Sequence, residues 1–185
     1  MGILSNDMNT LCQTIKIDRS INSFRSFIVL LCYRLQHYCY IKNHRILLYL
    51  AGGGKNVLFF FFHLDAQIFY EAQIGRHIRL PHSAMGVVIS SKAVIGNNVT
   101  VFHQVTLGVN ESKPCNEQAI IVHDNCYLSA GCKIISCVLS EGCKVAPNTC
   151  VYKDLSANTL CYTVNETREI RKKTATPITH SEDNE

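Results

Sequence analysis

The sequence lacks both a long uninterrupted apolar run and a secretory signal at its N-terminus. Basic residues interrupt the first third of the chain at Arg25, Arg34, Lys42, Arg45 and Lys55. A spanning helix needs roughly 18 consecutive apolar residues, and a secretory signal needs a basic segment, an apolar segment and a small-residue cleavage site in that order. We therefore expect a cytoplasmic protein that does not cross a membrane, with at most peripheral contact at the inner face.

The sequence also has few charged residues and no two cysteines at CxxC spacing. Charged residues make up 17% of the 185 positions and apolar residues 47%, a balance that suffices for one sizeable core. The basic residues between positions 168 and 173 have no aromatic residues interleaved with them, so nucleic-acid binding is not expected. The ten cysteines contain no CxxC pair, which argues against a zinc site. In a chain that is not exported they stay reduced.

The N-terminal region, residues 1–65, has a helical pattern. Residues 1–20 are typical of a weak helix or a loose arm. Apolar residues recur at the spacing of one helical face from position 24 to 41, which predicts a helix there. A second helical stretch over residues 44–64 contains Gly52, Gly53 and Gly54, where we expect a kink or a turn. The run from Phe59 to Phe62 could contact a membrane surface, but we expect it to be buried between subunits or against the following domain.

From Ile74 onward the aliphatic residues recur at six-residue intervals, which indicates an internal repeat. Two steps are irregular, nine residues from Leu80 to Ile89 and five from Ile134 to Leu139, and a polar insertion follows Gly108. The register continues through Leu80, Ile89, Ile95, Val101, Leu107, Val122, Leu128, Ile134, Leu139, Val145 and Val151. A small residue follows four positions later at Ala84, Ala93, Val99, Val105, Cys126, Cys132, Cys143 and Thr149. Coils of three short strands need a large apolar residue pointing inward and a small one near each corner. The cysteines in this set therefore act as small hydrophobic residues.

The segments Leu80–Ile89 (LPHSAMGVVI) and Ala93–Gly108 (AVIGNNVTVFHQVTLG) resemble the serine acetyltransferase branch of the hexapeptide-repeat acyltransferases. Within that branch the likeness is closest to the colanic-acid and capsular polysaccharide O-acetyltransferases. The resemblance implies a mainly β fold, a left-handed parallel β-helix over residues 66–165, preceded by the short α-helical region. It also implies a homotrimer or a dimer of trimers. Residues 166–185 are expected to form a basic and then disordered tail.

The same resemblance assigns roles to individual residues. His82 matches the histidine that takes the proton from an acceptor hydroxyl, which then attacks the thioester of acetyl-CoA. One full coil separates His82 from His103, so the two side chains should stack about 4.8 Å apart, the strand spacing. His103 is therefore a second catalytic candidate, or a structural residue of the same ladder. Gly108, Val109 and Ala130 match positions along the CoA arm, and no metal is expected.

Departures from the serine enzymes bear on the acceptor. Gln67 stands where those enzymes have an aspartate that pairs with the base, which leaves Asp65 and Glu71 as nearby substitutes. The loop from Asn110 to Gln118 lacks the Arg-His pair that holds a carboxylate, and the Gly-x-Pro-Ala signature after the last coil is missing. We therefore expect a sugar of a surface polysaccharide as acceptor.

Three alternatives stay open. The first is serine O-acetylation for cysteine synthesis, which the absence of the Arg-His pair disfavours. The second is a non-catalytic trimeric scaffold. The third is a metal-dependent carbonic anhydrase of the same fold, for which His77, His82, His103 and His123 could provide imidazole ligands across a subunit boundary.

Overall fold

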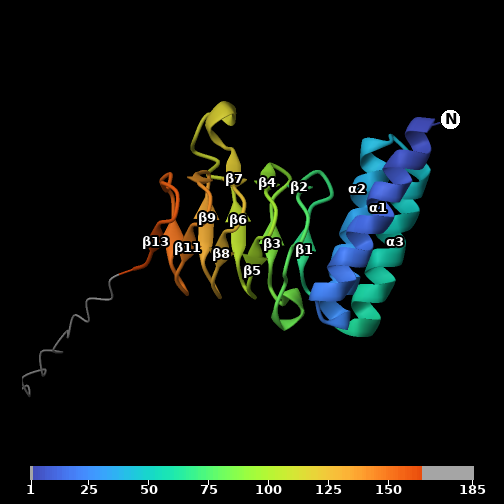
Figure 1. Ribbon diagram of the computed structural model, residues 1–185, viewed down its shortest axis with the longest axis horizontal. Coiled ribbons are helices and arrows are strands. Elements are labelled where there is room, and N and C mark those ends of the chain that lie inside the picture. Colours follow the sequence, from blue (N-terminus) through green and yellow to red (C-terminus); the bar gives the residue numbers. More distant parts are fainter. Residues whose placement is uncertain (1, 164–185) are drawn as a thin grey trace, which may run out of the picture.

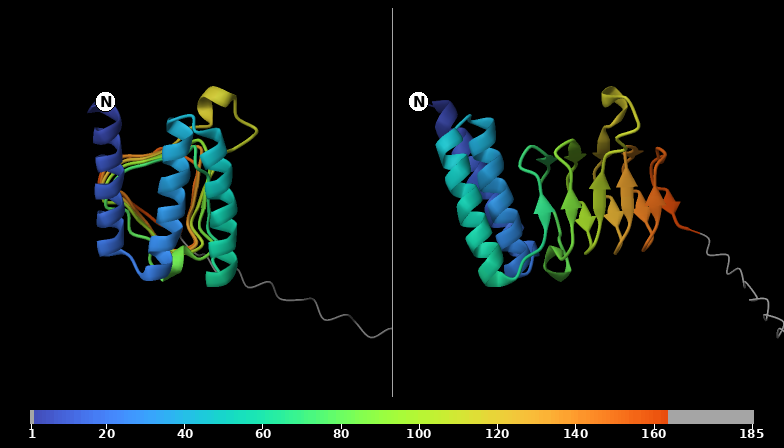
Figure 2. Two further views of the ribbon diagram at one scale, coloured as in Figure 1. Left: turned by 90° about the vertical axis from the view of Figure 1, so that its right-hand side faces the viewer. Right: turned by 180° about the vertical axis from the view of Figure 1, so that it is seen from behind.

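The computed structural model describes residues 2–163, with side chains from residue 8 onward. The predicted tail over residues 166–185 lies outside the described residues. Three helices come first: α1 (Gly2–Ile21), α2 (Phe24–Ile41) and α3 (Arg45–Phe62). They lie side by side as one layer that covers an end of the β-structure, with α2 in the middle (Figures 1 and 2).

The helices match the sequence pattern except at the glycines. Residues 2–21 form a helix rather than a loose arm, and α2 has the predicted bounds. The predicted break at Gly52–Gly54 is wrong, because α3 continues through these residues. Helix α2 packs along α3, and a Cβ atom on Gly52 would lie 3.5 Å from the Gln36 side chain. Packing against α2 therefore outweighs the low helix propensity of glycine.

Helix α3 is unusually exposed for an apolar helix. Phe59 packs partly against the core, whereas Phe60 is 75% exposed and Phe61 is 70% exposed, so the chain by itself does not bury this run. By length and composition α3 could cross a membrane, and none of its 18 residues is buried. The sequence pattern was interpreted as excluding a membrane-spanning segment. On length and composition that interpretation is wrong for α3, although core helices of soluble proteins meet the same two criteria.

The strands are short and form three parallel sheets. Sheet A contains β1 (Gln67–Ile68), β3 (Val88–Ile89), β6 (Thr106–Gly108), β9 (Lys133–Ile135) and β12 (Cys150–Val151). Sheet B contains β2 (Gln73–Ile74), β4 (Ala93–Ile95), β7 (Ile120–Val122) and β10 (Val138–Leu139). Sheet C contains β5 (Thr100–Val101), β8 (Tyr127–Leu128), β11 (Lys144–Val145) and β13 (Leu160–Cys161).

The chain visits sheets A, B and C in turn, so each coil is one level of a triangular prism (Figure 2). Val101 pairs with Leu128, and Leu128 pairs with Val145, which stacks equivalent residues of successive coils. The coils extend away from the helical layer (Figure 1). The three edges of the prism are named below by the sheets that the chain leaves and enters: A–B, B–C and C–A.

The core confirms the six-residue register. The aliphatic residues predicted to point inward from Leu80 to Val151 are each 3% exposed or less, and the small residues that follow them are 2% exposed or less. Burial raises the pKa of the Cys126 thiol to about 11 and that of Cys132 to about 12, so both thiols stay protonated at neutral pH. These cysteines therefore fill space like other small apolar residues.

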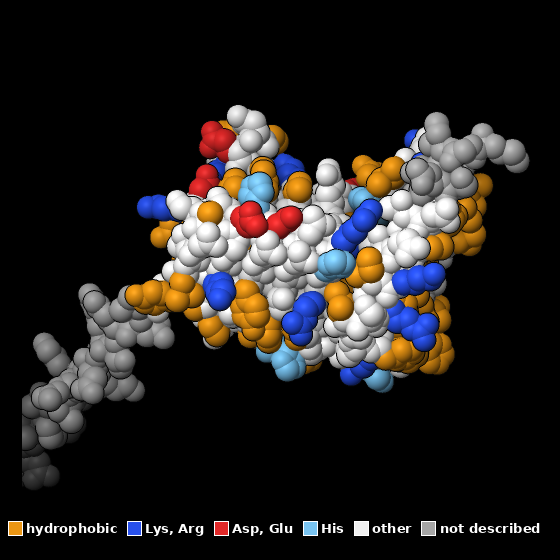
Figure 3. Space-filling view, viewed as in Figure 1, with side chains coloured by type: hydrophobic (Ala, Val, Ile, Leu, Met, Phe, Trp, Pro, Cys, Tyr) orange, Lys and Arg blue, Asp and Glu red, His pale blue; other side chains and the backbone are white. Residues whose placement is uncertain are grey.

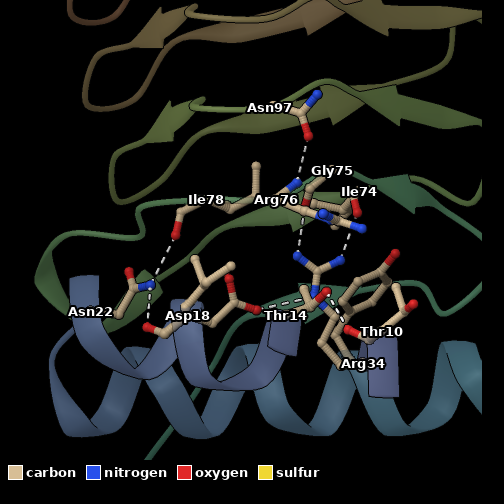
Figure 4. Close-up of polar contacts among 12 residues, drawn as sticks. Thr10, Thr14, Asp18, Asn22, Arg34, Ile74, Gly75, Arg76, Ile78 and Asn97 are labelled. Carbon is tan, nitrogen blue, oxygen red and sulfur yellow. Dashed lines mark hydrogen bonds and ion pairs between the residues drawn. The ribbon is translucent and has the colours of Figure 1, made fainter. Parts of the chain in front are cut away.

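A buried polar cluster joins the helical layer to the first coil (Figure 4). Arg34 of α2 donates hydrogen bonds to the carbonyl oxygens of Ile74 and Gly75, each at 2.6 Å, and its Nε lies 3.1 Å from Asp18 Oδ2. Desolvation raises the pKa of the Asp18 carboxyl above its ordinary value, although the Arg34 charge opposes this shift. The arginine thus connects two helices and the β-helix at one point.

Candidate functional site

His82 lies in a turn with an unusual backbone at the C–A edge. The turn η1 (His82–Ala84) fills the nine-residue step between the strand pairing at Arg79 and β3. Its residues have φ angles of 54°, 61° and 55°, all in the left-handed region. Each such non-glycine residue costs of order 1–3 kcal/mol unless its surroundings hold it in place. This step is three residues longer than a regular hexad, and a strained turn that projects from the prism takes up the additional length.

The end of this turn is held by its neighbours in sequence and in space. The backbone N–H of Gly86 donates to Asp65 Oδ1 at 3.0 Å. On the next coil, the backbone N–H of Gln104 donates to the Met85 carbonyl at 2.8 Å. Asp65 thus fixes the backbone after the turn, a role that the sequence did not distinguish from direct pairing with His82.

The helical layer holds the other end of the turn. Asn22, between α1 and α2, accepts a hydrogen bond from the backbone N–H of Leu80 at 2.7 Å and donates one to the Ile78 carbonyl at 2.9 Å. Ser26 Oγ donates to the Leu80 carbonyl at 2.6 Å. These contacts fix the backbone two residues before His82. The sequence does not predict these contacts, because more than 50 positions separate the partners and no periodic signal connects them.

The two histidines of the predicted ladder are neighbours. The ring centroids of His82 and His103 lie 4.9 Å apart with an interplanar angle of 79°, close to the spacing expected from the register. His82 is exposed and His103 is half-buried. Among the described residues, His103 Nδ1 is buried without a hydrogen-bond partner. A buried polar atom without a partner costs about 1–3 kcal/mol, and such atoms are often explained by a functional role.

An aromatic wall lies beside the histidine pair. The Phe102 ring is 5.9 Å from the His82 ring, and the Tyr127 ring is 5.2 Å from that of Phe102. Ala130 follows on the next coil, where the N–H of Gly131 donates to the His103 carbonyl at 3.0 Å. His82, His103 and Ala130 therefore succeed one another along the C–A edge, as the register predicted.

Gly108 and Val109 lie at the opposite end of strand β6, on the A–B edge. They begin the loop that carries the short turn η2 (Cys115–Glu117). This loop and the His82 turn project from opposite sides of the prism (Figure 1). One chain therefore does not bring all of the predicted residues together. A single site that contains both groups requires the C–A edge of one copy to face the A–B edge of another.

The loop is fixed to the prism by its own polar residues. Lys113 Nζ donates to the Ser136 carbonyl at 3.1 Å, and the backbone N–H of Asn110 donates to Ser136 Oγ at 2.7 Å. Gln118 donates to the Lys113 carbonyl at 2.8 Å and accepts from Lys92 Nζ at 2.5 Å. The loop's lysine is thus engaged with the backbone of the next coil.

The residues considered for other chemistry are separated. Glu71 lies between β1 and β2 on the A–B edge, away from His82. His77 and His123 lie on the B–C edge, where His77 Nδ1 is 2.8 Å from Asn98 Oδ1. Over residues 2–163, no group of three or more His, Cys, Asp or Glu residues is close enough to hold a metal ion. The four histidines thus do not form one ligand set within the chain.

Known proteins that are similar to this chain in sequence belong to one class of enzyme. No family model matches the chain. Serine acetyltransferase 5 of Arabidopsis thaliana is 30% identical over 121 residues, which are 65% of this chain and 36% of that protein. The serine acetyltransferase of Buchnera aphidicola is 35% identical over 112 residues, 60% of this chain and 40% of that protein. The chain thus spans less than half the length of these curated relatives.

Solved structures agree with the sequence relatives. Soybean serine acetyltransferase complexed with serine superimposes with a TM-score of 0.64 at 28% identity, covering 77% of this chain and 56% of that one. Serine acetyltransferase isoform 3 of Entamoeba histolytica, in complex with cysteine, covers 91% of this chain and 63% of its own with a TM-score of 0.69. At 22% identity, the second likeness shows the fold alone.

Fold and sequence together make the chain similar to the hexapeptide-repeat acyltransferases. The fold is a left-handed parallel β-helix with an α-helical N-terminal region, as predicted. The particular proteins that it matches are serine acetyltransferases. The finer likeness to colanic-acid and capsular enzymes stays a prediction.

Proposed function

We propose that the chain transfers an acetyl group from acetyl-CoA to a hydroxyl group, with His82 as the general base. One observation carries this proposal: an exposed His82 stands 4.9 Å, ring to ring, from His103 on the edge of a β-helix that serine acetyltransferases share. The sequence predicted His82 as the catalytic base and His103 as a second catalytic candidate or a structural residue of the same ladder. The strained turn and its supports hold His82 where an acceptor can reach it.

The chemistry needs a base because an alcohol is a weak nucleophile at neutral pH. His82 accepts the hydroxyl proton while the oxygen attacks the thioester carbonyl. The carbon–sulfur bond then breaks, and the proton passes from the imidazolium to the departing thiolate. The products are the acetyl ester and free CoA, and the imidazole is neutral again. His103 stands beside the base, and its buried Nδ1 atom has no hydrogen-bond partner among the described residues.

Acetyl-CoA is the proposed donor. Gly108 is the first residue proposed along the CoA arm, and a Cβ atom there would lie 3.2 Å from Ile135 Cδ1, so a larger residue would crowd the neighbouring coil. Val109 and Ala130 are the other residues proposed along the CoA arm. A serine acetyltransferase solved as a complex with CoA shares this fold, at 24% identity. No metal takes part in the proposed reaction.

The proposed assembly is a homotrimer, with a dimer of trimers as a larger form. In a trimer of parallel prisms, the His82 turn of one copy faces the Gly108 loop of the next, which unites groups that lie on opposite edges of one chain. The domain boundaries at residues 65 and 165 and a cytoplasmic location belong to the same proposal. The donor and the acceptor are both small or water-soluble molecules in this account.

Serine is the acceptor that the comparisons favour. The curated relatives act on serine according to their names, and one solved relative was complexed with serine. The serine alternative is thus better supported than the surface-polysaccharide sugar expected from the sequence.

A sugar hydroxyl is the second candidate because of one specific contact. Serine carries a carboxylate, which favours a cationic partner in the site. Lys113 is the loop's one cation, and its Nζ atom is already bound to the Ser136 carbonyl. A sugar needs no such partner, and the amide and hydroxyl groups of the loop are suited to it.

The acceptor is tested by measuring thiol release from acetyl-CoA with free serine and, separately, with a panel of monosaccharides and oligosaccharides. Mass spectrometry of the product identifies the acetylated molecule. Release that depends on serine supports the first candidate, and release that depends on a sugar supports the second. Binding of acetyl-CoA without release for any acceptor would favour the scaffold alternative and contradict the proposed activity.

A further inference from the structure

An apolar stripe runs the full length of α3. Its residues follow the three-to-four spacing of one helical face. They are 55% to 82% exposed and comprise Ile46, Tyr49, Leu50, Val57, Phe60 and Phe61. The opposite side of the helix includes the partly buried Leu48 and Phe59, and Phe59 packs against the core. The stripe thus lies opposite to the side of α3 that packs against the core, with Tyr49 at its edge toward α2.

The stripe continues onto the neighbouring helix. Phe24 of α2 is 66% exposed, and its ring lies 5.6 Å from the ring of Phe62 at the end of α3. Leu35 of α2 is also exposed. We call the α3 stripe together with Phe24 and Leu35 the helical face. Hydrophobic side chains gather at this end of the molecule, with Lys and Arg side chains among them (Figure 3). Apolar patches of this extent usually mark a binding surface.

The exposed charged side chains on the three helices have one sign over the residues that the structure describes. From residue 8 to the end of α3, the exposed charged side chains are Lys16, Arg19, Arg25 and Arg45. The acid in this range, Asp18, is buried against Arg34. Two copies packed face to face would bring these cations together, whereas an anionic surface would complement them. The charge pattern therefore favours an acidic lipid surface over a second copy of the chain.

We propose that the helical face binds an anionic lipid bilayer, with α3 lying in the plane of the interface. Its apolar stripe enters the boundary between headgroups and acyl chains, and the basic residues contact the headgroups. A spanning arrangement is disfavoured because α3 is packed along α2, which Arg34 and Tyr33 attach to the first coil by buried hydrogen bonds. The coils then extend away from the bilayer (Figure 1).

The test is co-sedimentation of the full chain with vesicles. Vesicles of phosphatidylcholine and phosphatidylglycerol in equal parts are compared with phosphatidylcholine alone, at low and high salt. The wild type should sediment with the anionic vesicles and bind less at high salt. The variant I46Q/L50Q/F61Q should stay in the supernatant. Reversing Lys16 and Arg45 to Glu should weaken binding by at least about fivefold per charge, from about 1 kcal/mol for each basic residue.

A matched control carries the same number of exposed apolar changes at the far end of the β-helix, Y152Q/L160Q/Y162Q, and should bind as the wild type does. Circular dichroism checks that each variant is folded.

Wild-type protein that stays in the supernatant with anionic vesicles would overturn the proposal. So would equal binding by the α3 variant. Salt-resistant binding that only detergent reverses would indicate a spanning helix instead. A smaller oligomer for the α3 variant, without vesicle binding by the wild type, would assign the face to a second copy.

Discussion

At the scale of single residues, the His82 turn combines chemistry with backbone strain. Three consecutive residues occupy the left-handed region, and none of them is glycine. Hydrogen bonds from Asn22 and Ser26 fix the backbone before the turn, and Asp65 fixes it after the turn. These contacts supply the constraint that such a conformation requires. The run of three strained residues thus includes His82, the residue proposed to accept the proton.

Replacing Ser83 by glycine should relieve part of this strain. Glycine adopts positive φ without steric cost, but it loses more entropy on folding. We expect Ser83→Gly to raise the free energy of unfolding by about 0.5–1 kcal/mol, measured by urea denaturation. The control Ser90→Gly, at a position without positive φ, should lower it. A loss of stability for Ser83→Gly as large as that of the control would show that the turn is not strained.

The sequence predicted the residues of the coil walls because each hexad repeats the same environment. The inward aliphatic residues, the small corner residues and the spacing of His82 and His103 all follow from that register. The left-handed turn did not follow, since the three additional residues of this nine-residue step can be accommodated in several ways. The role of Asp65 was also missed, because a side chain that binds a backbone N–H leaves no pattern in the sequence.

At the scale of elements, the helical layer and the β-helix depend on Arg34. Its guanidinium spans α1, α2 and the turn at Ile74 and Gly75. Removing one partner of a buried ion pair leaves the other charge without compensation, which typically costs 3–5 kcal/mol. The attachment of the helices therefore concentrates much of its polar stabilisation in one side chain.

We expect Arg34→Met to lower the free energy of unfolding by about 3–5 kcal/mol at neutral pH. The loss should shrink as the pH falls. Without Arg34 the pKa of Asp18, already raised by burial, rises further, so the carboxyl takes up a proton earlier than in the wild type. A protonated Asp18 carboxyl is neutral, so it no longer needs a cationic partner. Urea denaturation at several pH values measures this, with Arg19→Met as the exposed control. A pH-independent loss would contradict the role of the pair.

The sequence located the helices better than it described their packing. The apolar period gave α2 its bounds, because tertiary contacts and intrinsic propensity agree there. At Gly52–Gly54 intrinsic propensity disfavours a helix whereas tertiary contacts favour one, and contact with α2 keeps the helix continuous. The few charges in α3 were also taken to exclude a spanning segment. The helix nevertheless meets the length and composition of one.

At the scale of the whole molecule, the proposed site is divided between opposite edges of the prism. His82 and His103 lie on the C–A edge, and Gly108 and Val109 lie on the A–B edge. The family resemblance implied a homotrimer, whereas the periodicity of the repeat says nothing about neighbouring copies. The periodicity of the repeat does not predict the acceptor either. The loop sequence favoured a sugar, whereas the relatives favour serine.

A complementation experiment tests whether two copies share one site. Chains with His82→Ala and chains with Gly108→Val should each be inactive. When equal amounts are denatured together and reassembled, a trimer with sites between copies contains native sites at about one interface in four. Activity should recover to about a quarter of the wild-type value. Mixing without denaturation is the control. If both groups belong to one chain, reassembly will restore nothing.

The most direct measurement of the central claim is thiol release from acetyl-CoA by His82→Ala, with the acceptor that the wild type uses. Loss of a general base should reduce kcat by about 100- to 10,000-fold, while the affinity for acetyl-CoA stays unchanged. His123→Ala, an exposed histidine on the B–C edge, should retain wild-type activity. An unchanged rate for folded His82→Ala would contradict the assignment of His82 as the base and the mechanism built on it.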